Sequence, residues 1–475
     1  MSRQNQAILI ADLGFGDAGK GTITDFLTRR LPAHTVVRYN GGPQAAHNVV
    51  TPDGRHHTFS QFGSGMFLPR TATLLSRFML INPLNMLKEE RHLATLGIAD
   101  AFERTLIDRR ALVITPFHKA MNRLRELARA GERHGSCGEG IGECMADSLA
   151  HGDAQLFAGD LQDRAVIVRK LHFLYEIKRS ELEEIRSSLP DTDAVKQELA
   201  AFTRSDVITD CADVYRYFSQ RVAIIDDARI GSLLAQPGVV LFEGAQGVLL
   251  DENYGFAPYN TWSTTTFANA ETILREHDYS GDIIKLGVVR SYATRHGSGP
   301  FPTEDAALTS ALPDQHNTWN DWQRTFRVGY FDLVATRYAL NVVGHLDYLA
   351  LTHLDCLPVI PSPQICAAYH YQGTPDDLPG YFEHVADRIN SITVYRPIDL
   401  SHQEQLTERL WSCIPHYQSL APLSGCPHSS ERQLAYLKLL ETELDVPIAI
   451  ASYGPAATDK KCLLCPEFHI DQKRS

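Results

Sequence analysis

The sequence predicts an α/β fold: a large, mostly parallel central sheet with helices on both faces, opening with a P-loop-like strand, loop and helix. Three observations support this prediction. An apolar run at 7–11 leads into a glycine-rich loop and then into helical apolar spacing at 22–30. Later apolar runs end in polar loops followed by helical patterns, an alternation typical of parallel sheets. No linker, repeat or low-complexity stretch interrupts the pattern, so we expect one domain over 1–475.

The first loop, 12–21, carries the strongest chemical signal. Four residues separate Gly14 from Gly19-Lys20, as in loops whose backbone N–H groups and lysine hold phosphate oxygens. Gly21 stands where that pattern has Ser or Thr, so the hydroxyl that usually ligates Mg²⁺ is missing. Asp17 lies inside the loop instead, where it would ligate Mg²⁺ or take a proton from a substrate. The simpler interpretation is that Asp17 caps the following helix.

The remaining elements follow in order along the chain. Strands are expected at 34–40, 73–80, 239–242, 283–289, 348–351 and 446–451, and helices from Asn82-Pro83 and over 116–133 and 164–189. The alternating charges of 164–189 indicate a solvated, exposed face. Polar loops follow the strands at 243–247, 290–295, 352–355 and 452–455. Open parallel sheets bind ligands at the carboxyl ends of their strands, so we expect these loops to meet there.

Composition narrows the function classes. The chain lacks an apolar run of about 18 residues and a signal-like leader, so we expect a cytoplasmic protein without a membrane partner. The 45 Lys and Arg against 57 Asp and Glu argue against nucleic-acid binding, while small nucleotides remain acceptable ligands. Nine scattered cysteines are typical of reduced thiols. Cys462 and Cys465 have metal-ligand spacing, but without a second pair we interpret them as ordinary thiols.

A second glycine-rich loop, 41–48, contains His47, which small neighbours leave open to a ligand. With this loop the chain resembles the adenylosuccinate synthetase family. The matching stretches, in the family's order, are 16–21, 41–48, 242–247, 294–295 with 299–304, 352–355 and 452–455. The resemblance runs through most of the chain and implies the same α/β fold and a homodimer.

The resemblance also implies roles for individual residues. Asp17 would be the catalytic base, His47 would donate to the phosphoryl group in transfer, and Gln246 would read the purine edge. Mg²⁺ would lie at Asp17 and Ala46. GTP would be the phosphoryl donor, with ATP as the alternative because His353 replaces a lysine. The residues that contact the donor nucleotide would be Gly16, Gly19, Lys20, Gly21, Asp355, Ser452 and Gly454.

On the acceptor side the resemblance implies substrate contacts from Gln44, Ser136, Cys137, Thr261, Arg295 and Arg324. Arg324 would hold a carboxylate of aspartate, and Arg327 would either assist or lie on the surface. Several positions depart from the family pattern: Gln44 for Asn, Cys137 for Thr, Glu139 for Arg, and His151 near an arginine supplied across the dimer. Because Glu139 would add negative charge beside a 5′-phosphate, we expect an acceptor other than plain IMP.

The small-molecule substrates would therefore be a purine nucleotide and L-aspartate. The expected activity is GTP-dependent ligation of aspartate to a 6-oxopurine nucleotide through a 6-phosphoryl intermediate, giving adenylosuccinate or an analogue. Two alternatives remain open. One is the phage 2-aminoadenylosuccinate synthetase activity on GMP or dGMP, although those enzymes tend to have Ser at the position of Asp17. The other is a non-catalytic GTP-binding regulator, against which Asp17, His47 and Gln246 all argue.

Overall fold

A ten-stranded sheet forms the centre of the protein, here a computed structural model that describes residues 5–129, 136–312, 322, 325–360, 363–385, 388–420 and 429–464. In spatial order its strands are β21 (Lys460–Cys462), β20 (Ile448–Ser452), β15 (Tyr348–Thr352), β11 (Asp282–Arg290), β1 (Gln6–Asp12), β10 (Val239–Glu243), β2 (Ala33–Arg38), β5 (Ala72–Leu75), β7 (Thr105–Asp108) and β9 (Ala223–Ile225). Neighbouring strands are parallel except for β20 and β21. The predicted mostly parallel sheet is confirmed.

Both faces of the sheet are buried, as β1 shows. Its alternate residues Ile8 and Ile10 pack with α1 (Lys20–Arg30), while Ala7 and Leu9 join a cluster on the opposite face. Helices α8 (Asp227–Leu234), α9 (Ala268–Glu276), α11 (Leu333–Val343) and α14 (Ser429–Leu444) contribute to that second cluster. Burial on both sides explains why the strands are continuous apolar runs rather than alternating ones.

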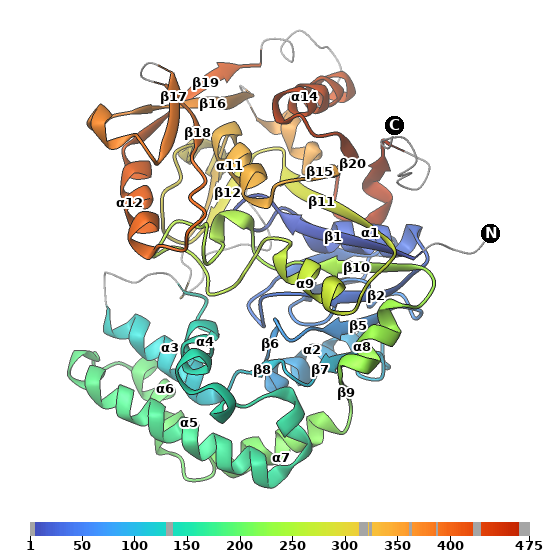
Figure 1. Cartoon of the computed structure of the whole chain (residues 1–475), viewed down its shortest axis with the longest axis vertical. Helices are drawn as coiled ribbons and strands as arrows, with labels where there is room; N and C mark the ends of the chain where they lie inside the picture. The colour runs from blue at the N-terminus through green and yellow to red at the C-terminus, as the bar shows by residue number, and fades with distance from the viewer. Residues whose placement is uncertain are drawn as a thin grey trace.

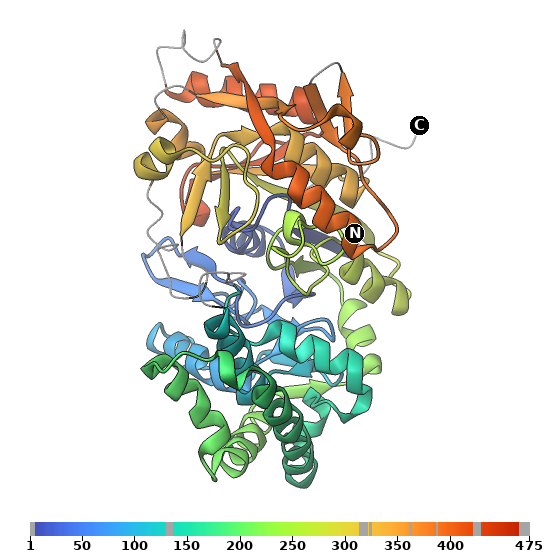
Figure 2. The ribbon, with the colours of Figure 1, turned by 90° about the vertical axis from the view of Figure 1, so that its left-hand side faces the viewer.

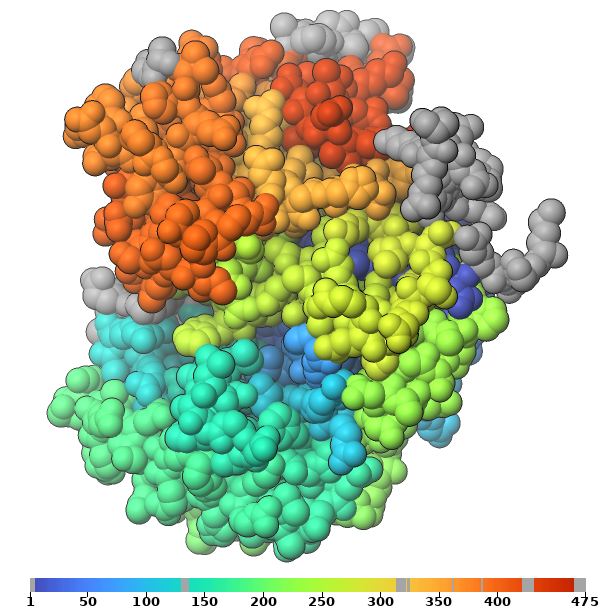
Figure 3. Space-filling view, viewed as in Figure 1, coloured from blue at the N-terminus to red at the C-terminus, as the bar shows by residue number. Residues whose placement is uncertain are grey.

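Two further groups of elements flank the sheet at opposite ends of the molecule (Figures 1 and 2). One, the helical group, comprises α3 (Pro116–Ala128), α4 (Ile141–His151), α5 (Arg164–Ile185), α6 (Asp193–Thr203) and α7 (Val207–Ser219). Helices α3, α5, α6 and α7 share an apolar core with α2 (Pro83–Thr95), while α4 packs in a smaller apolar cluster with Leu80 and Leu112. The other is a five-stranded sheet of β14 (Phe331–Asp332), β16 (Gln364–Tyr371), β17 (Phe382–Val385), β18 (Arg388–Ile392) and β19 (Cys413–Ser419), beside α12 (Leu400–Trp411). Figure 3 shows the helical group in teal and green and this second sheet in orange.

Three strand pairs complete the fold: β3 (His47–Val50) with β4 (His56–Phe59), β6 (Leu80–Ile81) with β8 (Leu112–Val113), and β12 (Ala293–His296) with β13 (Phe326–Gly329). The prediction of one strand over 73–80 is wrong. The chain turns after Leu75, and Leu80 belongs to the separate β6–β8 pair, because Met79 N bonds back to Ser76 O. A short helix, α10 (Ala306–Ala311), lies against β13.

Helix boundaries agree with their sequence signals where these are local. Asn82 caps α2 by accepting from Leu84 N and Asn85 N, as predicted. The helix expected over 116–133 ends at Ala128, and positions 130–133 lie outside the described residues. Within the described chain, no helix combines the length and apolarity needed to cross a membrane.

Candidate active site

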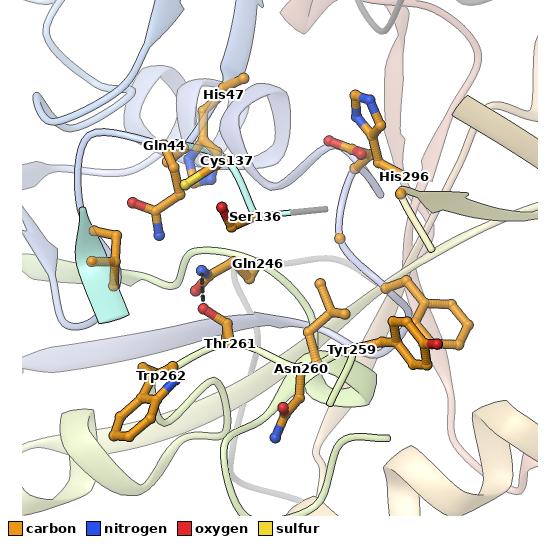
Figure 4. A pocket seen from close by; sticks show the side chains of 18 of the residues that line it. Gln44, His47, Ser136, Cys137, Gln246, Tyr259, Asn260, Thr261, Trp262 and His296 are labelled. Carbon is orange, nitrogen blue, oxygen red and sulfur yellow. Dashed lines mark hydrogen bonds between the residues drawn. The ribbon is translucent and has the colours of Figure 1, made fainter. Parts of the chain in front are cut away.

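A cavity of about 1220 Å³ lies where the carboxyl ends of β1, β2, β10, β11, β15 and β20 meet the helical group. Figure 4 shows one part of it, where Gln44, Ser136 and Cys137 face Gln246 and Thr261, with Tyr259 and His296 farther along the wall. The loops after these strands line one cavity, as predicted, because parallel strands place their carboxyl ends at the same edge of the sheet.

Asp12 shapes the phosphate-loop-like turn. Its carboxylate accepts from Gly14 N at 2.8 Å, Ala18 N at 2.9 Å and Lys20 Nζ at 3.0 Å. Lys20 also donates to the backbone oxygen of Gln246 at 2.6 Å, which ties this loop to the loop after β10. Lys20 lines the cavity and is only 3% exposed. Its ammonium group forms a buried ion pair with Asp12 in the cavity wall.

Asp17 lines the cavity from a left-handed backbone conformation with φ 60°. Burial raises the pKa of Asp17, while the positive charges of His296, Arg290 and Lys20 oppose that rise. The helix-capping interpretation is wrong, because Gly19 is the N-cap of α1 and no side chain caps it. Asp17 thus makes no cap, and it lines the cavity in which a substrate would bind.

A buried carboxylate, Glu243, holds the His47 ring. Its Nδ1 lies 2.7 Å from Glu243 Oε1, and Glu243 also accepts from Ser64 Oγ at 2.5 Å and from Ser64 N at 3.0 Å. Burial and the nearby Arg38 lower the pKa of His47 to about 4. Burial opposes ionisation of Glu243, but His47, Arg38 and Ser64 lower its pKa to about 2. Neutral His47 thus donates through Nδ1, leaving Nε2 for a ligand.

The same contacts explain Gly21, the departure from the usual phosphate-loop pattern. A Cβ at Gly21 would lie 2.7 Å from His47 Cβ and 3.1 Å from Ser64 Oγ. A Ser or Thr there would collide with the histidine. His47 therefore packs against the first turn of α1 at the place where the common pattern has a hydroxyl.

Two amides on the cavity wall carry buried polar atoms without a hydrogen-bond partner among the described residues. Gln246 donates through Nε2 to Thr261 Oγ1 at 2.8 Å and leaves Oε1 unpaired, and neither amide atom of Gln44 is paired. Buried polar groups are normally satisfied. These atoms are suited to donate to and accept from a polar ligand such as a purine.

The loop before α4 brings Ser136 and Cys137 to the cavity. Asn122 Nδ2 donates to Ser136 Oγ at 3.1 Å, and burial raises the pKa of Cys137 to about 11, so its thiol is uncharged. The expectation that Glu139 repels a phosphate is wrong. Its carboxylate accepts from Lys119 Nζ at 2.7 Å and Asn85 Nδ2 at 2.9 Å and is absent from the cavity lining.

Helix α5 is not simply solvated, contrary to the charge-pattern prediction. Lys178 is 1% exposed and lines the cavity. Its Nζ lies 2.7 Å from Asp147, 2.9 Å from Glu143 and 3.1 Å from Glu181, and Arg125 pairs with Glu143 and Glu181 as well. This network ties α3, α4 and α5 together behind the acceptor loop.

At the other end of the cavity lie Asp355, Ser452 and Gly454, the residues expected at the donor base. Ser452 Oγ donates to Gly454 O at 3.1 Å, and Lys460 Nζ donates to Gly454 O at 2.8 Å. Thr22 Oγ1 donates to Pro455 O at 2.6 Å, so the first turn of α1 holds this loop directly. The phosphate loop and the base loop therefore form one rigid surface.

The three arginines that were considered as substrate contacts lie in different environments. Arg295 is 1% exposed, donates to the backbone oxygens of Ser298, Pro300 and Tyr259, and lies behind the cavity wall. Arg327 is neither a surface residue nor directed at the cavity: it bonds Gly297 O, Gly299 O and Glu304. Arg324 lies outside the described residues.

The sequence did not single out several lining residues: His296, Tyr259, Asn260 and Trp262, and also Arg290 and Tyr292, which were expected only as part of the polar loop 290–295. Arg290 donates to Asp17 O at 3.0 Å, which connects the end of β11 to the phosphate loop. Arg290, Tyr292 and His296 surround the Thr294–Arg295 motif, so that motif was the available signal.

The site fits Mg²⁺ bound together with nucleotide. No cluster of three or more His, Cys, Asp or Glu side chains suited to a metal occurs in the described part of the chain. Mg²⁺ usually takes one or two carboxylates, waters and substrate phosphates rather than a complete protein cage. Asp17 and Ala46 both line the cavity, and they would hold the ion through the Asp17 carboxylate and the backbone oxygen of Ala46.

The fold and site define a nucleotide-dependent α/β enzyme whose phosphate loop carries an acid and faces a histidine and an amide. The family model described as adenylosuccinate synthetase matches residues 9–460. The chain belongs to the adenylosuccinate synthetase family, a family of C–N ligases that at the family level use GTP to join aspartate to IMP.

Individual relatives agree. Adenylosuccinate synthetase of Desulfovibrio desulfuricans is 31% identical over 446 residues, covering 93% of this chain and 96% of that protein. The Trichormus variabilis synthetase is 31% identical over 471 residues, covering 97% and 95%.

Two solved structures share the fold. Fully ligated adenylosuccinate synthetase from Plasmodium falciparum has a TM-score of 0.73 at 20% identity, covering 96% of this chain and 99% of that one. The cyanophage S-2L succinoaminodeoxyadenylate synthetase, bound to dGMP and dATP, has a TM-score of 0.58 at 16% identity, covering 97% and 96%. At these identities the likeness concerns the fold alone.

Proposed function

We propose that this protein is a GTP-dependent ligase that joins L-aspartate to a 6-oxopurine nucleotide through a 6-phosphoryl intermediate. The observation that carries the proposal is the convergence of Asp17, His47 and Gln246 on one cavity beside the phosphate loop. The product is adenylosuccinate or an analogue carrying a different purine nucleotide.

The chemistry explains why these groups are needed. A purine oxygen is a poor leaving group, so its replacement by an amine requires activation. Asp17 takes the ring N–H proton, and the purine oxygen then attacks the γ-phosphorus of GTP, releasing GDP. The aspartate amine next attacks the activated ring carbon, and phosphate leaves with the electrons of its C–O bond.

The protein's own groups position these steps. Gln246 Oε1 and Nε2 bind the purine edge, and His47 Nε2 meets the transferred phosphoryl group. Bound Mg²⁺ would supply charge neutralisation at Asp17 and Ala46. Gly16, Gly19, Lys20 and Gly21 form the wall against which the donor phosphates lie.

GTP is the proposed donor because Asp355, on the cavity wall beside Ser452 and Gly454, can accept a pair of hydrogen bonds from the N1–H and 2-amino group of guanine, and adenine has neither of these two donors. Half-saturation for GTP and ATP in a phosphate-release assay tests the choice. A clear preference for ATP would overturn it.

The acceptor is the most open part of the proposal. Gln44 and Cys137 replace the family residues, and three cations of the helical wall, Arg125, Arg129 and Lys178, are each paired with carboxylates. These features favour an acceptor other than plain IMP, with GMP or dGMP as the alternative. The phage enzyme of the same fold was solved with dGMP.

The decisive experiment incubates the protein with GTP, aspartate and each of IMP, dIMP, GMP, dGMP and the free nucleosides. Mass detection of the succinyl adduct then identifies the acceptor. Efficient conversion of IMP with no better alternative would show that the replaced residues are compensated. GTP binding without an adduct from any acceptor would favour a non-catalytic regulator.

We also propose a cytoplasmic homodimer that uses only small-molecule substrates. Purine nucleotides, GTP and aspartate are cytoplasmic metabolites. The net charge of −12 is unfavourable for a nucleic-acid partner.

A further inference from the structure

Ser64 lies directly behind the Glu243–His47 pair and makes two of the contacts that fix the carboxylate. Its hydroxyl donates to Glu243 Oε1 at 2.5 Å and its backbone N–H donates to Oε2 at 3.0 Å. The same Oε1 lies 2.7 Å from His47 Nδ1. Both oxygens of the carboxylate are therefore occupied, and its plane is set by the chain at Ser64.

This assembly is buried, and the chain that carries Ser64 is anchored on both sides. Ser64 and Glu243 are fully buried, and His47 is 7% exposed. The segment that carries Ser64 is itself anchored, because Arg38 donates to Ser60 O and Phe62 O while Glu89 accepts from Ser60 N and Gln61 N. These contacts hold the Glu243 carboxylate, and therefore its Oε1 acceptor, in one position relative to the imidazole.

Orientation matters because the two ring nitrogens differ in role. With Nδ1–H committed to Glu243, Nε2 is the ring nitrogen left for a ligand in the cavity that His47 lines. If the Glu243 carboxylate could rotate, the His47 ring would no longer be held in one tautomer, and the direction of Nε2 would no longer be fixed.

We propose that Ser64 is a positioning residue that acts through Glu243 to hold His47 in one tautomer and orientation toward the transferred phosphoryl group. The inference rests on the proposed function of His47. It assigns Ser64 no contact with substrate, since Ser64 is absent from the cavity lining.

A double-mutant cycle tests this inference. Ser64→Ala should lower kcat by roughly 10- to 100-fold, the range for groups that orient a functional side chain, with the KM for GTP within about twofold. In a His47→Ala background the same change should have no further effect on kcat, because Ser64 then has nothing to position. An additive loss in the double variant would overturn the proposal.

Ser219→Ala is the matched control. Ser219 is buried and bonded to Arg216 on α7, away from the cavity, so its loss tests what removing any buried serine hydroxyl does. We expect an unchanged kcat. A fall in kcat equal to that of Ser64→Ala would assign the Ser64 effect to general destabilisation and overturn the proposal.

A second measurement does not depend on turnover. Histidine labelled with ¹⁵N should show His47, identified by its loss in His47→Ala, as the Nδ1–H tautomer in the wild-type protein and as mixed tautomers in Ser64→Ala. An unchanged tautomer in Ser64→Ala would overturn the inference. If the tautomer shifts but no acceptor is ever converted, the positioning stands and the proposed ligase activity fails.

Discussion

Asp17 shows how one residue can acquire a chemical role from its surroundings. A carboxylate in a phosphate loop repels phosphate unless a cation or a proton compensates for it. Burial favours its protonated form, and His296, Arg290 and Lys20 favour the anion. A group balanced between these effects is suited to accept and release a proton.

Asp17→Asn should lower turnover by about 10² to 10⁴, because the amide cannot accept the ring proton. Nucleotide binding should persist, since Asp12 rather than Asp17 shapes the loop. Steady-state kinetics and calorimetric titration with GTP measure the two effects. Activity within a few-fold of wild type would exclude Asp17 as the base.

Lys178 has a structural role, because its removal leaves Glu143 and Asp147 without the cation that they share. Lys178→Met should destabilise the fold by about 3 kcal/mol, the lower end of the cost of breaking a buried pair. Urea unfolding midpoints give the measurement.

Arg179→Met on the same helix is the control for Lys178. Arg179 pairs with Glu176 where both are exposed, so its loss should leave the midpoint nearly unchanged. Equal midpoints for the two variants would show that the Lys178 network contributes no more than a surface pair.

At the scale of elements, the start of α1 joins three parts of the site. Thr22 holds the base loop, Lys20 holds the loop after β10, and Gly21 makes room for His47. One helical turn thereby fixes the relative positions of donor phosphates, donor base and histidine.

Gly21→Ala should both destabilise the protein by about 1 to 3 kcal/mol and reduce kcat, because the new methyl group would displace His47. Gly231→Ala in α8 is the matched control: its Cβ would meet only His277 Nδ1, at 3.4 Å, an ordinary contact. Alanine there should be neutral or slightly stabilising. If both variants unfold at the wild-type temperature and keep full kcat, His47 does not depend on Gly21.

At the scale of the whole molecule, the cavity lies between the sheet and the helical group, and its wall includes α4 up to His151. In the family pattern an arginine from a second subunit acts near this position. We therefore predict a homodimer, to be measured by multi-angle light scattering at assay concentration. A monomer that retains full turnover would contradict it.

The sequence alone determined the parts of this protein that depend on local spacing. The order of strand, glycine loop and helix at 6–30, the cap at Asn82 and the apolar strands with polar ends were predictable, because each depends on neighbouring residues. The parallel sheet and the meeting of polar loops at one edge followed from that alternation. The resemblance then assigned roles to positions such as Asp17 and His47.

Only the tertiary structure decided where charged side chains point. The Glu139 carboxylate pairs with Lys119, whereas the family pattern had placed it beside a phosphate. Lys178 is buried at the cavity wall, whereas the alternating charges around it had indicated a solvated face. Ser64 meets Glu243 across 179 residues of chain, a contact that no local spacing encodes. The physical reason is that a charge takes its role from the partners within a few ångströms, and folding brings those partners from distant segments.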